Sequence, residues 1–376
     1  MSTLATNAIT DASGGNTATI NGQTPTESNM AGRNRIINGD MRIDQRNAGA
    51  SVSNLDGFGV DRWYGSWTAG AGRLSAQQST VAPAGFTNSW LLTVTATNAS
   101  PAVGDGNLVD QRVEGFNIAD LGWGTANAQS VTVSFWVRSS VTGTFGFLIV
   151  NSANARAYGA TYTVNAANTF EYKTVTIPGD TAGTWLTNNG AGLGLRFGFC
   201  GGSSRTVSTG WSATSTFVLN VTGATNLMAT SGATFYLTGV QLEAGSVATP
   251  FERRHYGQEL ALCQRYYQKS YDYDTAPGTN TIVGSVTARG DSNTAMTNSP
   301  LGTRFVVTMR TVPTLVTYSR SGTSGRISNL GSTLSTESSV VTPTSIGGLG
   351  TTGISYVTSV ATGPGVSMQY TADAEL

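Results

Sequence analysis

The chain has 376 residues, of which 11% are charged and 39% are hydrophobic, and its 21 basic and 21 acidic residues cancel. A nucleic-acid binder usually carries a basic excess that neutralises phosphates, so we expect no nucleic-acid partner. No stretch approaches the ~20 apolar residues of a membrane span, so we expect no membrane insertion. Thr, Ser, Asn, Ala and Gly replace Glu and Lys, which disfavours long helices and favours short strands joined by turns. The composition therefore predicts an all-β protein.

The first segment, residues 1–32, is a polar leader. Leu4, Ile9 and Ile20 are its main apolar residues, too few for a core of its own. Such a segment is either a flexible tail or becomes ordered against another molecule. In the second case the other molecule would be a neighbouring subunit or an adaptor.

Residues 33–252 alternate β-branched and aromatic runs with turns rich in Gly, Asn and Pro. The clearest predicted strands cover residues 91–96, 131–137, 145–150, 170–177, 193–199, 215–221 and 235–242. No helical pattern interrupts them, which predicts a two-sheet β-sandwich, most simply a jelly roll. We expect residues 33–41 to open this module as a strand and residues 239–252 to close it.

Residues 253–269 predict a short helical connector of about three turns, because Leu260, Cys263, Tyr266 and Tyr267 follow helical spacing. Residues 270–376 predict a second, smaller β domain with strands at 281–287, 303–309, 314–319 and 353–360. Between residues 321 and 350 we expect long loops with weak strands. The apolar content of this domain is low, which is typical of a small core that relies on partner subunits.

The chain contains few residues that could carry out catalysis. The only histidine is His255 and the only cysteines are Cys200 and Cys263, so no metal finger can be built, and a Ser-His-Asp system would need His255. A glycosidase remains an alternative because two carboxylates are enough. Spacing selects no pair among Asp56, Asp61, Asp105, Asp110, Glu114, Asp120, Glu171 and Asp180. We predict that the chain is not an enzyme, has no catalytic residues, and buries both cysteines as small apolar groups.

Aromatic residues are better candidates, because sugar rings stack on Trp and Tyr faces while polar side chains bond the hydroxyls. In residues 131–138, alternation puts the valines and Phe135 on one face and Trp136 with Arg138 on the other. A tryptophan on the polar face indicates a ligand platform, a subunit interface or a covering loop. The predicted carbohydrate-binding set is Trp136, Arg138, Trp123, Tyr158, Trp185 and Trp211, with Trp63, Tyr64 and Trp67 as further aromatic candidates.

Three segments together resemble a recurrent family of bacteriophage and prophage tail-fibre proteins. The first segment is NRIINGDMRIDQR at residues 34–46, followed by DRW at 61–63. The second, which is the most specific, is GVQLEAGSVATPFE at 239–252, running into QELALCQRYY at 258–267. The third is RFVVTMRTVPT at 304–314, with YTADAEL at 370–376.

This resemblance implies a virion appendage, made in the bacterial host cytoplasm and commonly homotrimeric, with a jelly roll like that of carbohydrate-binding modules. Its implied partners are other tail proteins (adaptor, nozzle or fibre) and a host surface glycan. A structural Ca²⁺ is also implied, with Asp40 and Glu243 as candidate oxygen ligands. Thr238 stands where such modules often place an acidic ligand, which is a departure from the pattern. The alternatives are a polysaccharide depolymerase, for which no internal repeat is found, and a free prophage glycan-binding protein.

Overall fold

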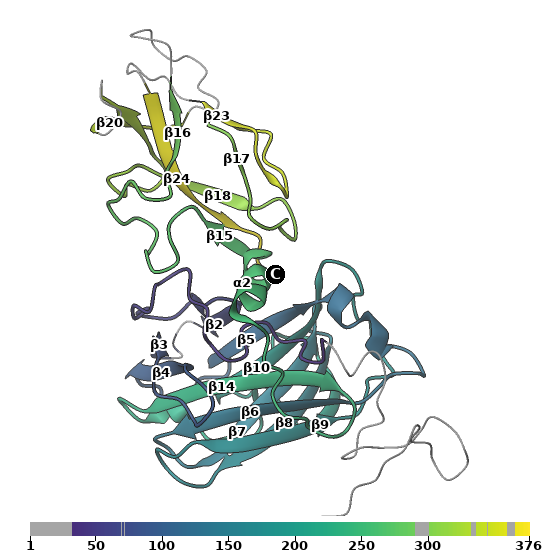
Figure 1. The fold of residues 1–376 in the computed structure, drawn as a ribbon. Coiled ribbons are helices and arrows are strands. Elements are labelled where there is room, and N and C mark those ends of the chain that lie inside the picture. The colour runs from purple at the N-terminus through teal and green to yellow at the C-terminus, as the bar shows by residue number, and fades with distance from the viewer. Residues whose placement is uncertain are drawn as a thin grey trace, which may run out of the picture.

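The computed structural model describes residues 32–68, 70, 72–289, 301–331, 336–343, 345–358 and 365–376. These residues form two β lobes with one α-helix, α2 (Tyr256–Gln264), at the waist between them (Figure 1). The prediction of an all-β protein with a jelly-roll sandwich, a short helix and a smaller C-terminal β part is confirmed. Residues 1–31 of the predicted leader lie outside the described residues.

The lower lobe in Figure 1 is a sandwich of two antiparallel sheets. The seven-stranded sheet contains, in spatial order, β1 (Gly57–Val60), β2 (Trp63–Trp67), β5 (Gly106–Glu114), β10 (Ala191–Gly201), β7 (Gly143–Asn151), β8 (Arg156–Val164) and β12 (Gly210–Ala213). The five-stranded sheet contains β3 (Arg73–Ser79), β4 (Ser89–Ala96), β14 (Thr234–Ala244), β6 (Val131–Ser139) and β9 (Glu171–Ile177). When β4 to β10 and then β14 are numbered one to eight, the sheets run 1-8-3-6 and 2-7-4-5, which is the jelly-roll arrangement.

Apolar side chains from both inner faces fill the sandwich. The predicted alternation along β6 is confirmed, since Val131, Val133, Phe135 and Val137 are fully buried in the core. Phe135 packs against Phe197 of β10 with ring centroids 5.0 Å apart. Most predicted strands of this lobe form, but residues 215–221 contribute only β13 (Asn220–Val221), which pairs in parallel with β11 (Thr206–Val207). The turns hold three 3-10 helices, η1 (Gly115–Asn117), η2 (Ala119–Leu121) and η3 (Leu227–Ala229).

The expectation that residues 33–41 open the sandwich as a strand is wrong. These residues form an irregular segment in which Asn38 and Met41 have positive φ angles of 56° and 59°. Their backbone N–H groups donate to side chains: Ile37 N to Gln111 Oε1 and Asn38 N to Glu259 Oε1. Backbone bonds to β14 join Arg35 N to Leu242 O and Val240 N to Gly39 O, both at 2.9 Å, but the irregular backbone between them prevents a continuous strand ladder. Residues 239–244, in contrast, belong to β14 as expected.

The upper lobe is built around β24 (Gly365–Asp373). Its sheet also contains β15 (Tyr267–Lys269), β16 (Val286–Arg289), β18 (Thr314–Tyr318), β19 (Ile327–Leu330) and β20 (Glu337–Val341). Two further strand pairs join β17 (Thr303–Arg304) to β22 (Gly353–Ile354) and β21 (Ser345–Gly347) to β23 (Tyr356–Thr358). The helix is shorter than predicted, because Tyr267 leaves it to pair with Asp373 of β24. The predicted limits 33–252, 253–269 and 270–376 stay predictions.

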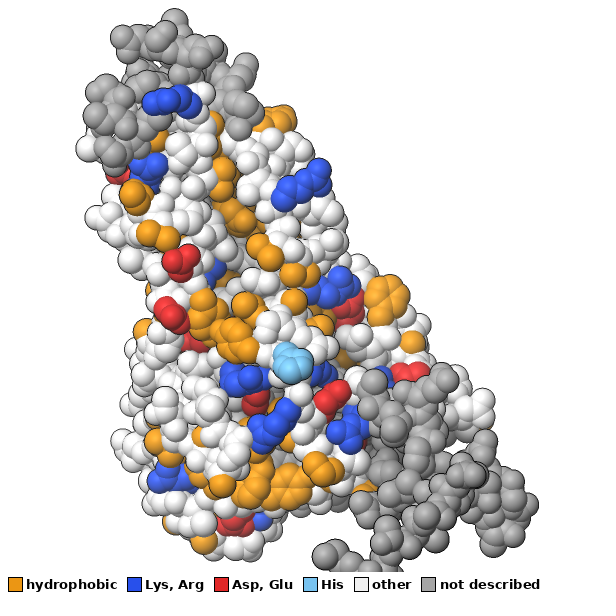
Figure 2. Space-filling model, viewed as in Figure 1, with side chains coloured by type: hydrophobic (Ala, Val, Ile, Leu, Met, Phe, Trp, Pro, Cys, Tyr) orange, Lys and Arg blue, Asp and Glu red, His pale blue; other side chains and the backbone are white. Residues whose placement is uncertain are grey.

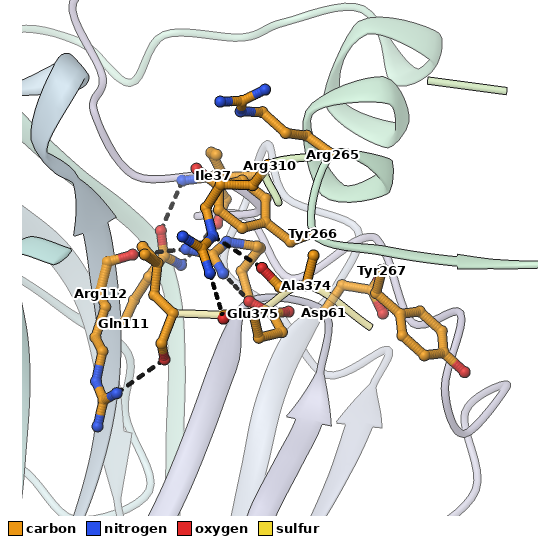
Figure 3. A network of polar contacts seen from close by, with 12 residues as sticks. Ile37, Asp61, Gln111, Arg112, Arg265, Tyr266, Tyr267, Arg310, Ala374 and Glu375 are labelled. Atoms are coloured by element: carbon orange, nitrogen blue, oxygen red, sulfur yellow. Dashed lines mark hydrogen bonds and ion pairs between the residues drawn. The ribbon is translucent and has the colours of Figure 1, made fainter. Parts of the chain in front are cut away.

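Arginines fasten the end of β24 to the lower lobe (Figure 3). Arg62 forms an ion pair with Glu375, and its guanidinium lies 3.6 Å from the centre of the Tyr266 ring. Arg46 pairs with Asp373 at 2.8 Å and with Glu375 at 3.1 Å. We call this set of ion pairs the waist network. Because its arginines come from the segment before β1 and from the β1–β2 turn, it joins the two lobes directly.

Candidate functional site

Side chains on the outer face of the five-stranded sheet form a row of rings. Strand pairing places Thr238 of β14, Trp136 of β6 and Tyr172 of β9 beside one another. Trp136 is half-buried and Tyr172 is 44% exposed, with their rings 5.5 Å apart. These side chains share one face because successive residues of a strand point to opposite faces. The row is the accessible counterpart of the buried valines on the inner face.

A second row runs beside the first. Tyr236 of β14 lies opposite Arg138 of β6, and the Arg138 guanidinium lies 4.8 Å from the centre of the Tyr236 ring. Phe170, just before β9, packs on Tyr236 with centroids 6.1 Å apart. Arg138 also donates from Nε to the backbone oxygen of Asn168 at 2.9 Å. The cation is therefore held over aromatic rings, which fixes its position on the face.

Phe86 and Phe251 extend the first row of side chains at the end where β14 lies. Their rings meet at 5.2 Å, and the Arg253 guanidinium lies 4.7 Å from the Phe86 ring. Gly239 allows the approach, because a Cβ there would come within 2.7 Å of Phe86 and 3.1 Å of Trp136. Its φ of +61° accompanies the shift in register within β14. We call Phe86, Trp136, Arg138, Phe170, Tyr172, Tyr236, Phe251 and Arg253 the aromatic band.

The band has the chemistry of a carbohydrate platform. Ring faces supply apolar area for the C–H patches of sugars, and arginines supply donors for their hydroxyl groups. Figure 2 shows hydrophobic side chains gathered with basic ones over the lower lobe. Tyr172 and Tyr236 were not among the sequence candidates, although alternation along residues 170–177 and 235–242 puts both on the outer face.

The other predicted tryptophans form a packed cluster at a different place. Trp123 and Trp185 are each 6% exposed, and Trp211 packs on both at 5.6 and 5.8 Å. Each indole N–H donates to a backbone oxygen: Trp123 to Gln129, Trp185 to Ala182 and Trp211 to Pro178. Tyr158 joins the cluster, 5.1 Å from Trp211. Their rings are used in packing, and a glycan contact for them stays an untested prediction.

The two candidate calcium ligands are already engaged with protein groups. Asp40 forms an ion pair with Arg42. Glu243 accepts hydrogen bonds from Gln241 Nε2 and from the Thr249 backbone N, both at 2.8 Å. Within the part of the chain that the structure describes, no group of three or more His, Cys, Asp or Glu side chains could hold a metal ion. The arrangement therefore gives no support to calcium binding by Asp40 and Glu243.

Several acids considered for a glycosidase pair are bound to different arginines. Asp180 accepts two hydrogen bonds from Arg156, at 2.7 and 2.8 Å, while Asp120 pairs with Arg35 at 2.6 Å. Glu114 pairs with Arg265 at 2.7 Å. Although burial opposes it, hydrogen bonds from Arg265 and Tyr266 lower the pKa of Glu114. A general acid needs a raised pKa, so Glu114 is unsuited to that role.

The remaining sequence candidates have structural positions. Cys200 and Cys263 are buried, as predicted, whereas His255 is exposed and precedes α2. Trp63 is fully buried in the sandwich core. None of the helices among the described residues is long and apolar enough to cross a membrane.

Comparison with known proteins shows similarity at the level of the fold. No protein-family model and no curated protein matches the chain. A tailspike domain of bacteriophage CBA120 is 14% identical to this chain, with a TM-score of 0.32. The match covers 56% of this chain and 21% of the tailspike chain. A family 11 carbohydrate-binding module from Clostridium thermocellum is 14% identical with a TM-score of 0.29, covering 53% of this chain and 98% of that chain. A putative sugar binding protein from Bacteroides thetaiotaomicron is 9% identical with a TM-score of 0.32, covering 57% and 100%.

All three similarities are below the level that supports a conclusion about function. The identities and TM-scores are too low to transfer a ligand, an activity or a site to this chain. No relative confirms the tail-fibre family indicated by the three sequence segments. The function must therefore be argued from the residues of this chain.

Proposed function

We propose that the chain is a structural component of a phage tail fibre or appendage that recognises a host surface glycan through the aromatic band. The observation that carries this proposal is the row of Trp136 and Tyr172 on an accessible sheet face, with Arg138 fixed beside it. A soluble domain that presents large rings and arginines together on one face has a surface suited to a ligand. The tail-fibre context is supported by the three segments that resemble that family.

In this proposal each part of the chain has a role. Residues 1–32 attach the protein to the virion or contact neighbouring subunits. Residues 33–252 bind the glycan, residues 253–269 connect this part to the next, and residues 270–376 form the tip of the appendage. Three copies of the chain assemble around a common axis. The mass in solution, with and without residues 1–32, tests the assembly. A protein that is monomeric both with and without residues 1–32 would count against the appendage role and favour a free glycan-binding protein.

Binding to purified host surface polysaccharide tests the glycan role. We expect Tyr172→Ala to weaken binding about fivefold, because stacking on one ring is worth about 1 kcal/mol. Tyr356→Ala is a matched control, since Tyr356 is 42% exposed and lies in β23 of the other lobe. Equal loss in both variants, or loss in neither, would refute the aromatic band as the binding site.

The same incubation separates recognition from depolymerisation. A binding protein leaves the polysaccharide chain length unchanged, whereas a depolymerase shortens it. Size-exclusion chromatography of the polysaccharide after incubation measures this directly. Shortening by the wild-type protein would replace the structural role with an enzymatic one.

A further inference from the structure

The outer face of the seven-stranded sheet holds a pocket that the aromatic band does not include. Strand pairing places Tyr64 of β2, Asp110 of β5 and Arg196 of β10 next to one another on this face. Farther along the sheet, Val218 and Val221 pack against Leu148 and close the surface. The pocket is the part of this face that stays open.

The pocket has a volume of about 260 Å³ and is lined by side chains from both lobes. Tyr64, Ser66, Asp110 and Arg112 come from β2 and β5, Phe217 comes from the segment that covers the sheet, and Glu375 follows β24. The waist network thus supplies one wall of the cavity, through Glu375. Aromatic walls, a carboxylate and a guanidinium around one small cavity are a combination that polar ring compounds require.

Asp110 is the distinctive group in the pocket. Its side chain is 2% exposed, and Oδ1 accepts no hydrogen bond from the described residues. Oδ2 lies 3.8 Å from Arg196 Nε and 3.9 Å from Arg112 Nε, so it forms ion pairs without a short hydrogen bond. Burial raises the pKa of Asp110, while the arginines oppose that shift. A buried acceptor without a donor is unfavourable, and a turn of the Asp110 carboxylate toward the cavity would let a ligand hydroxyl satisfy it.

The charges around the pocket exclude a simple cation site. Arg62, Arg112 and Arg196 outnumber Asp110 and Glu375 among the groups at or next to the cavity. Such a balance repels ammonium groups and metal ions and tolerates a neutral or acidic ligand. Phe217 covers the Arg196 guanidinium at 4.1 Å, which keeps this cation in place behind Asp110.

We propose that this pocket binds a single sugar ring, neutral or acidic, as a second glycan site on the sheet opposite the aromatic band. The ligand class rests on the proposed function, whereas the pocket itself is defined by its own residues. The sugar would donate a hydroxyl to Asp110 Oδ1, accept from Arg112 and place its C–H face against Phe217 or Tyr64. The aromatic band would then bind several sugar units along a glycan chain, and the pocket would bind a single sugar unit.

Ligand-observed saturation-transfer NMR with millimolar glucose, galactose, N-acetylglucosamine and glucuronate tests the proposal. We expect a signal for at least one of these sugars with the full chain. Ser66→Leu should abolish it by filling the pocket from the rim, and Asp110→Asn should reduce it at least tenfold. Tyr356→Ala is the control, because it removes an exposed ring of the upper lobe that belongs to neither site. Thermal unfolding of each variant shows whether the fold is retained.

The outcomes separate the two sites. Loss in Ser66→Leu with retention in Tyr356→Ala supports the pocket, even where polysaccharide binding proves independent of the band. Equal signals in wild type and Ser66→Leu, or no signal with any of the four sugars, would overturn the pocket proposal and leave the band untouched. If Asp110→Asn fails to fold, Ser66→Leu decides alone, since Ser66 lies outside the Asp110–Arg196 pair.

Discussion

The interiors of the two lobes are stabilised by different forces. The lower lobe has an apolar interior in which Phe135, Phe147 and Phe197 pack ring against ring at 5.0 to 6.4 Å. In the upper lobe, Val366 and Met368 face a small apolar cluster, while the intervening Ser367 is buried among polar groups. Apolar packing is non-directional, whereas a buried polar network is stable only when each member is satisfied.

This difference explains why the upper lobe is tied to the lower one. Arg320 donates from Nε to Ser367 Oγ at 3.0 Å, and Gln369 Nε2 donates to the backbone oxygen of Thr281 at 2.6 Å. Each such bond adds only about 1 kcal/mol to net stability. A lobe built this way gains from external support, and the waist network supplies it. We therefore expect the lower lobe to be the more stable part of the molecule.

Removing a large core ring provides the strongest test of this comparison. Phe197 is fully buried and contacts Trp63, Phe135 and Phe147. We expect Phe197→Ala to lower the free energy of unfolding by about 3–5 kcal/mol. Hydrogen exchange should then rise in both lobes, because the upper lobe loses its support. Exchange that rises only in the lower lobe would show that the upper lobe is independently stable.

Breaking the waist network should uncouple the lobes. Arg62 and Glu375 have side chains that are 2% and 7% exposed. Arg62→Met leaves the buried Glu375 carboxylate with Arg46 as its one remaining partner in the waist network, which costs up to about 3 kcal/mol. We expect faster hydrogen exchange in β24 with little change in β6 and β10. Arg35→Met is the matched control, because its partner Asp120 is 45% exposed, and such pairs contribute about 1 kcal/mol or less. Similar effects of the two variants would contradict a special role for the waist.

Much of the lower lobe could be predicted from the sequence, because its strands carry strong local signals. Alternation in residues 131–137 identifies both the buried face of β6 and the outward position of Trp136. Residues 33–41 misled the prediction, since their apolar side chains are buried by an irregular segment that bonds to distant side chains. A local pattern reports that a residue is buried, but not which partner its backbone meets.

The upper lobe and the pocket were largely beyond sequence reasoning. The central strand β24 has the sequence GVSMQYTAD, in which Ser367, Gln369 and Thr371 are polar yet buried. The alternation itself is that of a strand, but it predicts that the polar face is exposed and cannot show that both faces are buried. Asp110 and Glu375 likewise meet only because the fold brings β5 and the end of β24 together. Charge pairs separated by hundreds of residues leave no periodic signal.

A single hydroxyl deletion sharpens the contrast between the two interiors. Ser367→Ala removes the acceptor for Arg320 Nε and for Thr287 Oγ1. We expect a loss of about 1–2 kcal/mol in the stability of the upper lobe, because buried donors lose a partner. Ser338→Ala serves as the control, since Ser338 is exposed in β20 and the change should stay within about 0.5 kcal/mol. Urea unfolding followed by hydrogen exchange in β24 measures both variants.

The smallest effect concerns the pH dependence of the contact between α2 and the sandwich. Glu114 accepts hydrogen bonds from Arg265 and Tyr266, and its pKa is lowered from the usual 4.5. For a carboxyl with a lowered pKa in the folded state, the stabilisation is present above the usual value and is lost as the pH falls through the folded-state value. The stability advantage of wild type over Glu114→Gln should therefore shrink on acidification from about pH 7 to about pH 3.

Glu171→Gln is a useful reference, because the pKa of Glu171 is lowered to about 2 and its partner Lys173 lies in the same strand, away from the waist. If hydrogen exchange in α2 responds to acid equally in all three proteins, the Glu114–Arg265 pair does not hold the helix against the sandwich, and the buried cluster of Cys263 with Ile37 and Ile43 is the contact that does.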